Sequence, residues 1–423
     1  MALIHASKYK PRVFPVKGDD TGLGAEIDRA QSITPSIALN REKVKEIGRT
    51  DAVGYIKRSP TVGYTLTQYE YGNIEFWQKL INSTTKGNVG QTEIDLDDFK
   101  TAYFDIVAYL TDDDDNFKGT VWYPGLRTSG FSLTIGDPQA IIERSFDFVG
   151  ESAITWQGDN KYFIMVRSEV ESGDLSSGND YDIDLSTRVP VEDPVTADKF
   201  MQRVVRIRSG VSTELTAGSS SGEYEYTASA TTLTVHGAQI GDIYKVYYTS
   251  STAPATQFTD NDADPAGLTG EDVSIYLYVP GSGKPSASDY LYRLQSVTLE
   301  VSFEREDIRE IGNKEIVARG ARERTVTVTL GRIVDDFTVE EVLSGAVDDF
   351  GKLDVQQFSD DMALIIKIYD DNTKANFKYG FLATGLSPTE VNPSVAVNEY
   401  HTKETVLECE TLKISADSTV LGI

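Results

Sequence analysis

Residues Gln295–Leu330 read QSVTLEVSFEREDIREIGNKEIVARGARERTVTVTL, and this stretch has a second copy near the N-terminus. Gln31–Leu66 reads QSITPSIALNREKVKEIGRTDAVGYIKRSPTVGYTL, and the two stretches align without a gap from Gln31/Gln295 to Leu66/Leu330. Fourteen of the 36 aligned positions are identical. An ungapped self-match of this density indicates one structural unit that is used twice.

Each copy opens with apolar and polar residues in alternation, which predicts a strand with one buried and one solvated face. The apolar positions are Val297, Leu299, Val301 and Phe303 in the second copy, and Ile33, Pro35, Ile37 and Leu39 in the first. The polar positions between them include Thr34, Ser36, Thr298 and Glu300.

Each copy closes with a second strand of the same kind. Its apolar positions are Val62, Tyr64 and Leu66, with Val326, Val328 and Leu330 as equivalents, and its polar positions are Thr61, Gly63, Thr65, Thr325, Thr327 and Thr329. About twenty mostly charged residues separate the two strands in each copy, whereas a hairpin needs only about 2–5. We expect the loops Arg41–Arg58 and Arg305–Arg322 to contact something; a flexible loop is the alternative.

Composition narrows the class of protein. A chain of 423 residues predicts two or three domains. The single cysteine, Cys409, excludes disulfides within the chain, and the N-terminal residues show no apolar run typical of a signal peptide or a membrane span. A net charge of −26 argues against wrapping nucleic acid, but suits a surface that DNA passes without adhering. The alternative is that the acidic charge only maintains solubility.

The elements after each copy follow one order. Asn73–Asn82 has apolar residues at helical spacing, and strands are expected at 102–110, 120–123, 131–135 and 142–149. After the second copy, 338–343 replaces the helix, and strands are expected at 362–369, 395–400 and 404–412. The fold class is therefore predicted as mainly β (α+β), with two repeated β-sandwich units that each carry one flanking helix.

The middle of the chain differs from both copies. Gly- and Ser-rich turns separate short predicted strands at 204–207, 223–226, 233–235 and 243–248, which indicates a small all-β domain. We expect a first unit at 1–165, a linker and this inserted domain at 166–270, and a second unit at 271–423.

No motif for catalysis or for a cofactor is present. The three histidines stand in unlike local patterns, and GSGKPS (281–286) fails as a phosphate loop because Pro285 takes the Ser/Thr position. A weak calcium candidate combines Asp260, Asp262, Asp264 and Glu271, but Pro265 stands where such a loop needs Gly. A solvated acidic loop is the favoured interpretation, and no enzyme activity is expected.

The two copies carry a family resemblance. LQSVTLEVSFEREDIREIGNKE and AQSITPSIALNREKVKEIGRTD resemble the inner strand and first loop of phage tail tube proteins. The resemblance implies a β-sandwich unit, rings of six units, and stacked rings whose inner strands line a channel for DNA during genome ejection. The duplication resembles tail tubes in which two fused units per chain form a trimeric, pseudo-sixfold ring, with the middle domain outside.

The resemblance also implies roles for particular residues. Those expected to face the lumen are Thr34, Ser36, Thr61, Gly63, Thr65, Thr298, Glu300, Thr325, Thr327 and Thr329. Those expected in loops that contact the neighbouring ring are Arg41, Glu42, Glu46, Ile47, Gly48 and Arg58, with Arg305, Glu306, Glu310, Ile311, Gly312 and Arg322. The implied partners are further copies of the chain, the tape measure, terminator and baseplate proteins, and a sheath where the tail is contractile. The implied location is the virion tail, assembled in the host cytoplasm.

Other functions remain open at this level. Another tail component built on the same unit, such as a terminator, a baseplate ring or a secretion-tail tube, is the first alternative. A surface β-adhesin is the second, and a hydrolase with no recognisable site is the third.

Overall fold

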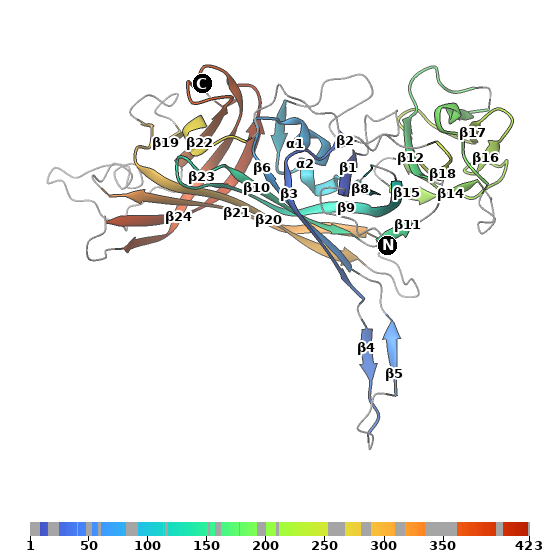
Figure 1. Ribbon diagram of the computed structural model, residues 1–423, viewed down its shortest axis with the longest axis horizontal. Helices are drawn as coiled ribbons and strands as arrows, with labels where there is room; N and C mark the ends of the chain where they lie inside the picture. The colour runs from blue at the N-terminus through green and yellow to red at the C-terminus, as the bar shows by residue number, and fades with distance from the viewer. Residues whose placement is uncertain are drawn as a thin grey trace.

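The computed structural model of the chain describes residues 9–15, 25–39, 41–47, 53–57, 61–81, 92–112, 114, 117–150, 153–156, 162–176, 178–192, 200–208, 211–252, 267–280, 289–308, 318–334, 362–394 and 401–421. The described chain is mainly β, as the sequence predicts. Two short α-helices, α1 (Glu75–Leu80) and α2 (Asp98–Thr101), accompany the strands β1 to β24 (Figure 1).

A 15-stranded antiparallel sheet runs through both copies. Its main path is β19-β22-β23-β24-β21-β20-β9-β10-β6-β3. Strand β20, which lies in the second copy, therefore pairs with β9, which follows the first copy in the sequence. Its strands are β1 (Tyr9–Pro15), β2 (Ala25–Glu26), β3 (Ala30–Ala38), β6 (Thr61–Tyr69), β7 (Glu93–Asp95), β8 (Phe104–Thr111), β9 (Phe117–Ile135), β10 (Glu143–Gly150), β11 (Ile154–Trp156), β19 (Val273–Tyr278), β20 (Leu294–Ile308), β21 (Ala318–Ile333), β22 (Met362–Tyr369), β23 (Phe377–Ser394) and β24 (Thr402–Ser415).

The two copies pair their strands in the same register. β3 pairs with β6 through Ile33 and Leu66, and β20 pairs with β21 through Val297 and Leu330, which are the aligned positions of the two copies in the sequence. Each ladder also shifts at the same place, between Ala30 and Ser32 in one and between Leu294 and Ser296 in the other.

The strands that follow correspond as well. In the ladder with β10, β9 shifts register at Ser129, and in the ladder with β24, β23 shifts at Thr389. Gly125 and Gly385 both have positive φ, of 61° and 66°. A bulge and a left-handed glycine at equal spacing fix the alignment of β9 with β23, in which Gly125 matches Gly385 and Ser129 matches Thr389.

The core lies on the apolar side of the sheet, under the two helices. Alternation brings Val62, Tyr64 and Leu66 inward, where they are at most 1% exposed. Trp77 of α1 is fully buried against Phe131, Phe146 and Phe381, with ring centroids 4.8–5.8 Å away. Phe381 belongs to β23, which follows the second copy in the sequence, whereas α1 follows the first copy. The aromatic cluster therefore packs the two halves of the large sheet together.

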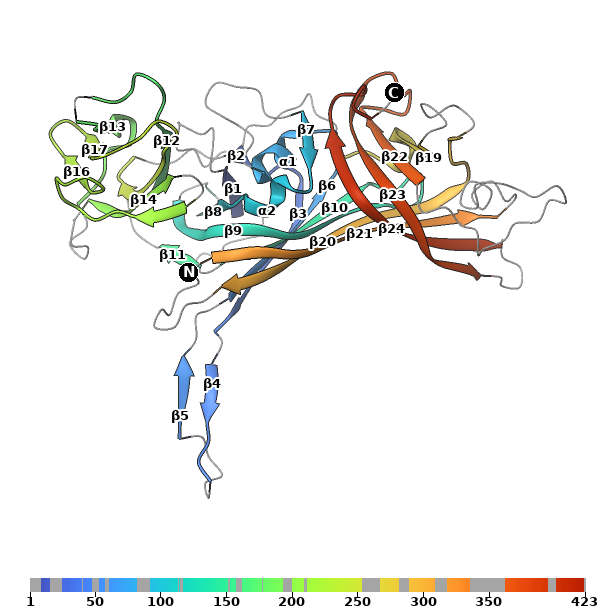
Figure 2. The ribbon, with the colours of Figure 1, turned by 180° about the vertical axis from the view of Figure 1, so that it is seen from behind.

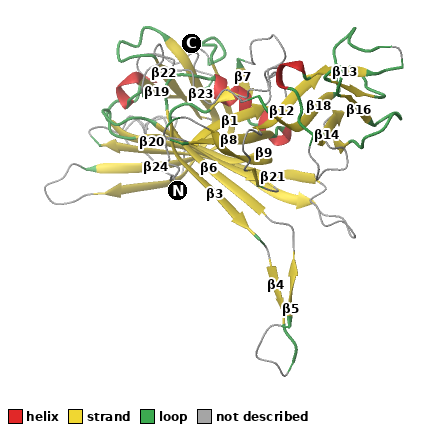
Figure 3. Ribbon diagram, turned by 45° about the vertical axis from the view of Figure 1, so that its right-hand side comes forward, coloured by secondary structure: helices red, strands yellow, loops and turns green. Residues whose placement is uncertain are grey.

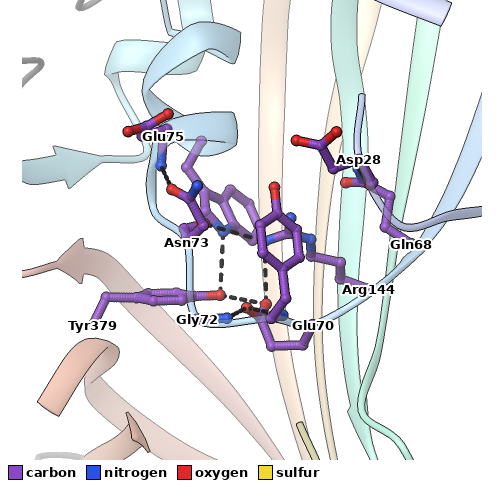
Figure 4. A network of polar contacts seen from close by, with 10 residues as sticks. Asp28, Gln68, Glu70, Gly72, Asn73, Glu75, Arg144 and Tyr379 are labelled. Atoms are coloured by element: carbon purple, nitrogen blue, oxygen red, sulfur yellow. Dashed lines mark hydrogen bonds and ion pairs between the residues drawn. The ribbon is translucent and has the colours of Figure 1, made fainter. Parts of the chain in front are cut away.

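A buried polar network crosses the same boundary (Figure 4). Arg144 of β10 and Glu70 are both fully buried and form an ion pair at 3.2 Å. Tyr379 of β23 donates a hydrogen bond to Glu70 Oε2, and Trp77 Nε1 donates to the Tyr379 hydroxyl at 3.4 Å. Glu70 also accepts from the backbone N–H groups of Tyr71 and Gly72. Most of the carboxylate's acceptor capacity is therefore used inside the protein.

The middle of the chain forms two smaller sheets around a second core. A four-stranded sheet has the order β12-β18-β14-β15 and a three-stranded sheet the order β13-β17-β16. Their strands are β12 (Tyr162–Glu169), β13 (Tyr181–Asp184), β14 (Met201–Arg208), β15 (Val211–Glu214), β16 (Tyr224–Thr227), β17 (Thr232–Val235) and β18 (Ile243–Ser250). Figures 1 and 2 place these sheets at one end of the large sheet, with β19 and β22–β24 at the other.

A packed contact joins the middle sheets to the large sheet. Val205, Ile207, Ile243 and Tyr247 share an apolar cluster with residues of β8 and β9. Beside it, the buried Asp105 carboxylate accepts hydrogen bonds from Trp122 Nε1 and the Gly125 N–H on one side, at 3.2 and 3.0 Å. From the middle sheets it accepts from Lys245 Nζ and the Tyr247 hydroxyl, at 3.2 and 2.8 Å. The Asp105 carboxylate thus links the large sheet to the middle sheets by hydrogen bonds.

The expected loops Arg41–Arg58 and Arg305–Arg322 are partly strands, and that prediction is wrong. The first holds the hairpin β4 (Arg41–Val44) and β5 (Gly54–Lys57), while β20 and β21 continue as a pair to Ile308 and from Ala318. When charged residues lie on both faces of a strand, the sequence shows no alternation of apolar and polar residues. The strand still forms, because backbone pairing needs no apolar face.

Other elements also differ from expectation. Helix α1 begins at Glu75, two residues after Asn73, whose side-chain oxygen accepts a 2.7 Å hydrogen bond from the Glu75 N–H. Helix α2 and strand β7 were not predicted, because each is too short for a periodic signal. The helix expected at 338–343 and the strand expected at 395–400 lie outside the described residues.

Candidate functional site: the polar face and the edges of the large sheet

One face of the large sheet carries polar side chains, and we call it the polar face. It is the side of β6, β9, β10, β20, β21 and β24 opposite the core. In Figures 1 and 3, helices α1 and α2 and strands β1 and β8 lie over the other side, and the hairpin β4–β5 projects away beyond the polar face. Thr61, Gly63 and Thr65 of β6 and Thr327 and Thr329 of β21 are half-buried there.

The remaining residues expected to face a lumen also lie on this face. Thr34, Ser36, Glu300 and Thr325 are exposed, and Thr298 is half-buried. Direct cross-strand pairs link them, for example Ser36 with Gly63 and Glu300 with Thr327. A Cβ on Gly63 would stand 2.6 Å from the Ser36 Oγ, so the glycine lets a polar side chain lie flat across the strand.

Carboxylates gather on the polar face. Ladder register places Glu300, Glu408 and Asp147 on it, with Thr65 Oγ1 donating a 2.6 Å hydrogen bond to Asp147. The exposed acidic residues that share this face include Glu143, Asp147, Glu300, Glu390, Glu404 and Glu408. A sheet of small hydroxyls and carboxylates is solvated and repels polyanions.

The edge strand β3 departs from its predicted burial. Its polar residues are exposed, but so are Pro35, Ile37 and Leu39, the last two by 54% and 58%. The equivalent residues of β20, Leu299, Val301 and Phe303, are at most 3% exposed. The difference has a plain cause: β20 lies between β21 and β9, whereas β3 pairs only with β6 among the described strands.

A second edge belongs to β23. Residues Phe377–Leu386 pair with β22 on one side, but Glu390–Ser394 pair only with β24 within the described ranges. The equivalent half of β9, Gly130–Ile135, carries β20 on that side. Both β3 and this half of β23 therefore present backbone hydrogen-bonding groups at an exposed edge.

Arg305 clamps β20 onto the first-copy region. Its guanidinium donates to the Thr128 carbonyl from Nε at 2.9 Å and from Nη2 at 2.7 Å. It also donates to the carbonyls of Lys100 and Phe99 in α2, at 2.8 and 2.7 Å. From the sequence, Arg305 was expected in a loop that contacts a neighbouring ring. In the structure, its guanidinium instead binds backbone carbonyls of its own chain.

The hairpin β4–β5 exposes apolar side chains. Ile47 is fully exposed at its tip, and Val44, Tyr55 and Ile56 are exposed along its length. Arg41, Glu42 and Glu46 are exposed beside them, whereas Gly48 and Arg58 lie outside the described residues. In the second copy Glu306 and Arg322 are exposed, and Glu310, Ile311 and Gly312 lie outside the described residues.

The remaining candidates carry no site. Glu271 lies in a 3₁₀ turn closed by Thr269 and Asp272, while Asp260, Asp262 and Asp264 lie outside the described residues. Within the described ranges there is no group of three or more His, Cys, Asp or Glu side chains arranged to hold a metal, and no helix long and apolar enough to cross a membrane.

Comparisons with known proteins find similar solved structures, of which three are described here. No family model matches the sequence, and no curated protein matches it. The SPP1 tail tube aligns with 36% of this chain and 81% of its own, at 12% identity and a TM-score of 0.25. The sheath–tube complex of the extracellular contractile injection system PVC aligns with 35% and 90%, at 12% identity and 0.25. The tube-terminating cap of the anti-feeding prophage aligns with 40% and 97%, at 12% identity and 0.26.

Proposed function

We propose that this protein is a structural subunit of a phage tail tube, in which chains close into rings and rings stack around a channel for DNA. The observation that carries the proposal is the lateral joint between β20 and β9. There, β20 of the second copy pairs edge to edge with β9, which follows the first copy in the sequence. The polar face is continuous across this joint. A unit that adds to its own kind, and still has free edges, is suited to closed assembly.

The duplication sets the proposed stoichiometry. One chain supplies two copies of the unit, so three chains supply the six units of a pseudo-sixfold ring. Closure also removes the two exposed edges, which are otherwise an aggregation hazard. The middle domain docks at the end of the sheet through Asp105 and its apolar neighbours, on the side away from the polar face. We assign it to the outside of the tube.

The polar face is the proposed channel wall. Its small residues and carboxylates match what a passing polyanion requires, since binding DNA would need clustered Lys and Arg. The exposed hairpin β4–β5 is the proposed contact with another ring, because its mixed charges and exposed apolar side chains favour a protein partner. The tape measure, terminator, baseplate and sheath proteins are the further partners of such a tube.

Negative-stain electron microscopy with mass photometry of the purified protein tests the proposal. We expect hollow tubes or rings, and ring masses of three 46.6 kDa chains. Rings of six chains would contradict the trimer. Short closed rings that never elongate would indicate a terminator or baseplate ring instead. Monomers at every concentration and salt, also in the presence of preformed tube ends from the same tail, would contradict the tube itself.

A further inference from the structure

We propose that β3 of one chain pairs antiparallel with residues Glu390–Ser394 of β23 in a second copy of the chain, in the register of the internal β20–β9 joint. The inference rests on the proposed function, because it specifies how a ring closes. It assigns the partner surface residue by residue, from a joint that the chain already contains.

The internal joint is the template. β20 pairs with β9 at Leu299 and Leu133, at Glu300 and Ser132, and at Val301 and Phe131. The apolar pairs lie on the core side and the polar pair on the polar face. Phe303 then contacts Phe99 and Phe131, with ring centroids 5.7 and 6.3 Å apart, so the joint buries the apolar side of β20 completely.

Two correspondences transfer this register to the exposed edges. β3 corresponds to β20, with Ser36 equivalent to Glu300, through the gapless alignment of the two copies. β23 corresponds to β9, with Asn392 equivalent to Ser132, through the shared bulge and the shared left-handed glycine. The resulting pairs between chains are Thr34 with Ser394, Pro35 with Pro393, Ser36 with Asn392, Ile37 with Val391, and Ala38 with Glu390.

The side chains fit these pairs. Ile37, now 54% exposed, meets Val391, and Ser36 meets Asn392. A register shifted by one residue would oppose apolar and polar faces. Pro35 and Pro393 fall opposite each other, so the two absent N–H donors are confined to one rung of the ladder.

Arg41 supplies a second point of registration. It is the equivalent of Arg305, whose guanidinium grips the Thr128 carbonyl at the β9 bulge. The equivalent carbonyl on β23 is that of Pro388, beside its own bulge. Arg41 is exposed in the single chain and stands next to the end of β3. In the assembled ring it donates to the Pro388 carbonyl of the second copy.

The two joints differ at one position. A Cβ on Gly130 would come within 2.9 Å of the Val301 carbonyl, and the residue equivalent to Gly130 is Glu390. The joint between chains must therefore open slightly at Ala38. This widening lies at the end of the ladder, next to the bulge, where strands diverge readily.

Paired cysteines test the register. Ser36→Cys with Asn392→Cys places two thiols at directly opposed positions, whose Cβ atoms are about 4.5–5.5 Å apart in an antiparallel ladder and close enough for a disulfide. The matched control is Ser132→Cys with Glu300→Cys, the same pair within one chain. The off-register control is Ser36→Cys with Glu390→Cys. The native Cys409 is 7% exposed, and the parent protein, which carries only this cysteine, measures the background of disulfide formation between chains.

Oxidised assemblies are then analysed on non-reducing denaturing gels, with the same samples viewed by electron microscopy. We expect Ser36→Cys/Asn392→Cys to give covalent dimers and trimers with trimers as the end product, and the off-register pair to give several-fold less. Co-assembly of the two single variants should stop at covalent dimers. The internal control should lose its free thiols without changing mass.

Two results overturn the inference in distinguishable ways. If tubes form and the internal control oxidises, but the predicted pair gives no bond between chains or the off-register pair dominates, the register is wrong and the tube stands. If no variant and no parent sample forms rings or tubes, the proposed function fails, and the joint between chains fails with it.

Discussion

At the scale of single residues, Arg144 carries a fully buried positive charge that depends on one carboxylate. Burial lowers the pKa of the guanidinium, but Glu70, Tyr379 and Tyr71 together outweigh this effect and hold the pKa above the ordinary value. The guanidinium also lies 4.9 Å from the Tyr71 ring centroid. Aromatic faces and one ion pair thus replace the water that an exposed arginine would have.

Glu70→Gln should destabilise the subunit strongly, because it leaves Arg144 charged and buried without a counter-ion. Breaking a buried pair from one side costs about 3–5 kcal/mol. Tyr379→Phe is the matched control: it removes one hydrogen bond to the same carboxylate, at about 1–3 kcal/mol. Urea unfolding at pH 7 measures both. Equal midpoints for Glu70→Gln and the parent would contradict this role.

A pH dependence is expected from Asp242 in the middle domain. Burial raises the pKa of this carboxyl, but the Arg208 guanidinium, which donates hydrogen bonds at 2.6 and 2.7 Å, and other donors bring the pKa below its usual range. A depressed pKa contributes stability above the unfolded carboxyl's pKa of about 3.9, and the contribution is lost as pH falls through the folded value. Asp242→Asn should therefore lower the thermal midpoint at pH 7, and the difference from the parent should vanish in strong acid. A difference that grows on acidification would contradict the assignment.

At the scale of elements, β3 and β20 have nearly the same pattern but different surroundings. Arg305 binds three carbonyls of its own chain, whereas Arg41 is exposed. Arg305→Gln should lower the unfolding midpoint of the subunit, since hydrogen bonds from a charged group contribute about 1.5–3 kcal/mol. Arg41→Gln should leave that midpoint unchanged and reduce assembly. Thermal unfolding and sedimentation of the assembled fraction separate the two. A destabilised Arg41→Gln subunit would place this residue in the fold rather than in the joint.

The edge strand and the hairpin should fail at different steps of assembly. Ile37→Lys puts a charge into the lateral joint and should prevent ring closure, a device that natural edge strands use against pairing. Ile47→Asp changes the hairpin tip and should leave rings intact while shortening or abolishing stacks. Electron microscopy scores rings and tubes separately. If Ile47→Asp abolished rings, or Ile37→Lys left them, the proposed division of labour would be wrong.

At the scale of the whole molecule, the polar face is the proposed channel wall, and its charge should decide whether DNA adheres to it. Glu300→Lys with Glu408→Lys reverses two charges on this face in every subunit. We expect assembled tubes of the parent to retain no double-stranded DNA in a filter assay, and tubes of the double variant to retain it with a steep loss as salt rises. Glu300→Gln with Glu408→Gln is the matched control and should retain none. Retention by the parent would contradict the proposed channel wall.

Much of the fold was predictable from the sequence, because its cause is local. Alternation in β6 and β21 predicted which side chains are buried, and Met362–Tyr369 is a strand at its expected bounds. The paired strands inside Arg41–Arg58 were missed, because charged residues on both faces give no period. The burial expected for Ile37 and Leu39 was wrong for the single chain, since burial depends on a neighbour rather than on the strand's own pattern.

The sequence by itself determined the repeat, the strand faces and the acidic character, since each depends on the order of residues along the chain. Only the tertiary structure decided which strand lies beside which. Two strands of similar pattern, β3 and β20, differ in burial because one has β9 beside it and the other is an edge. Long-range pairing depends on the distant strand that supplies the partner, and no local pattern encodes its identity.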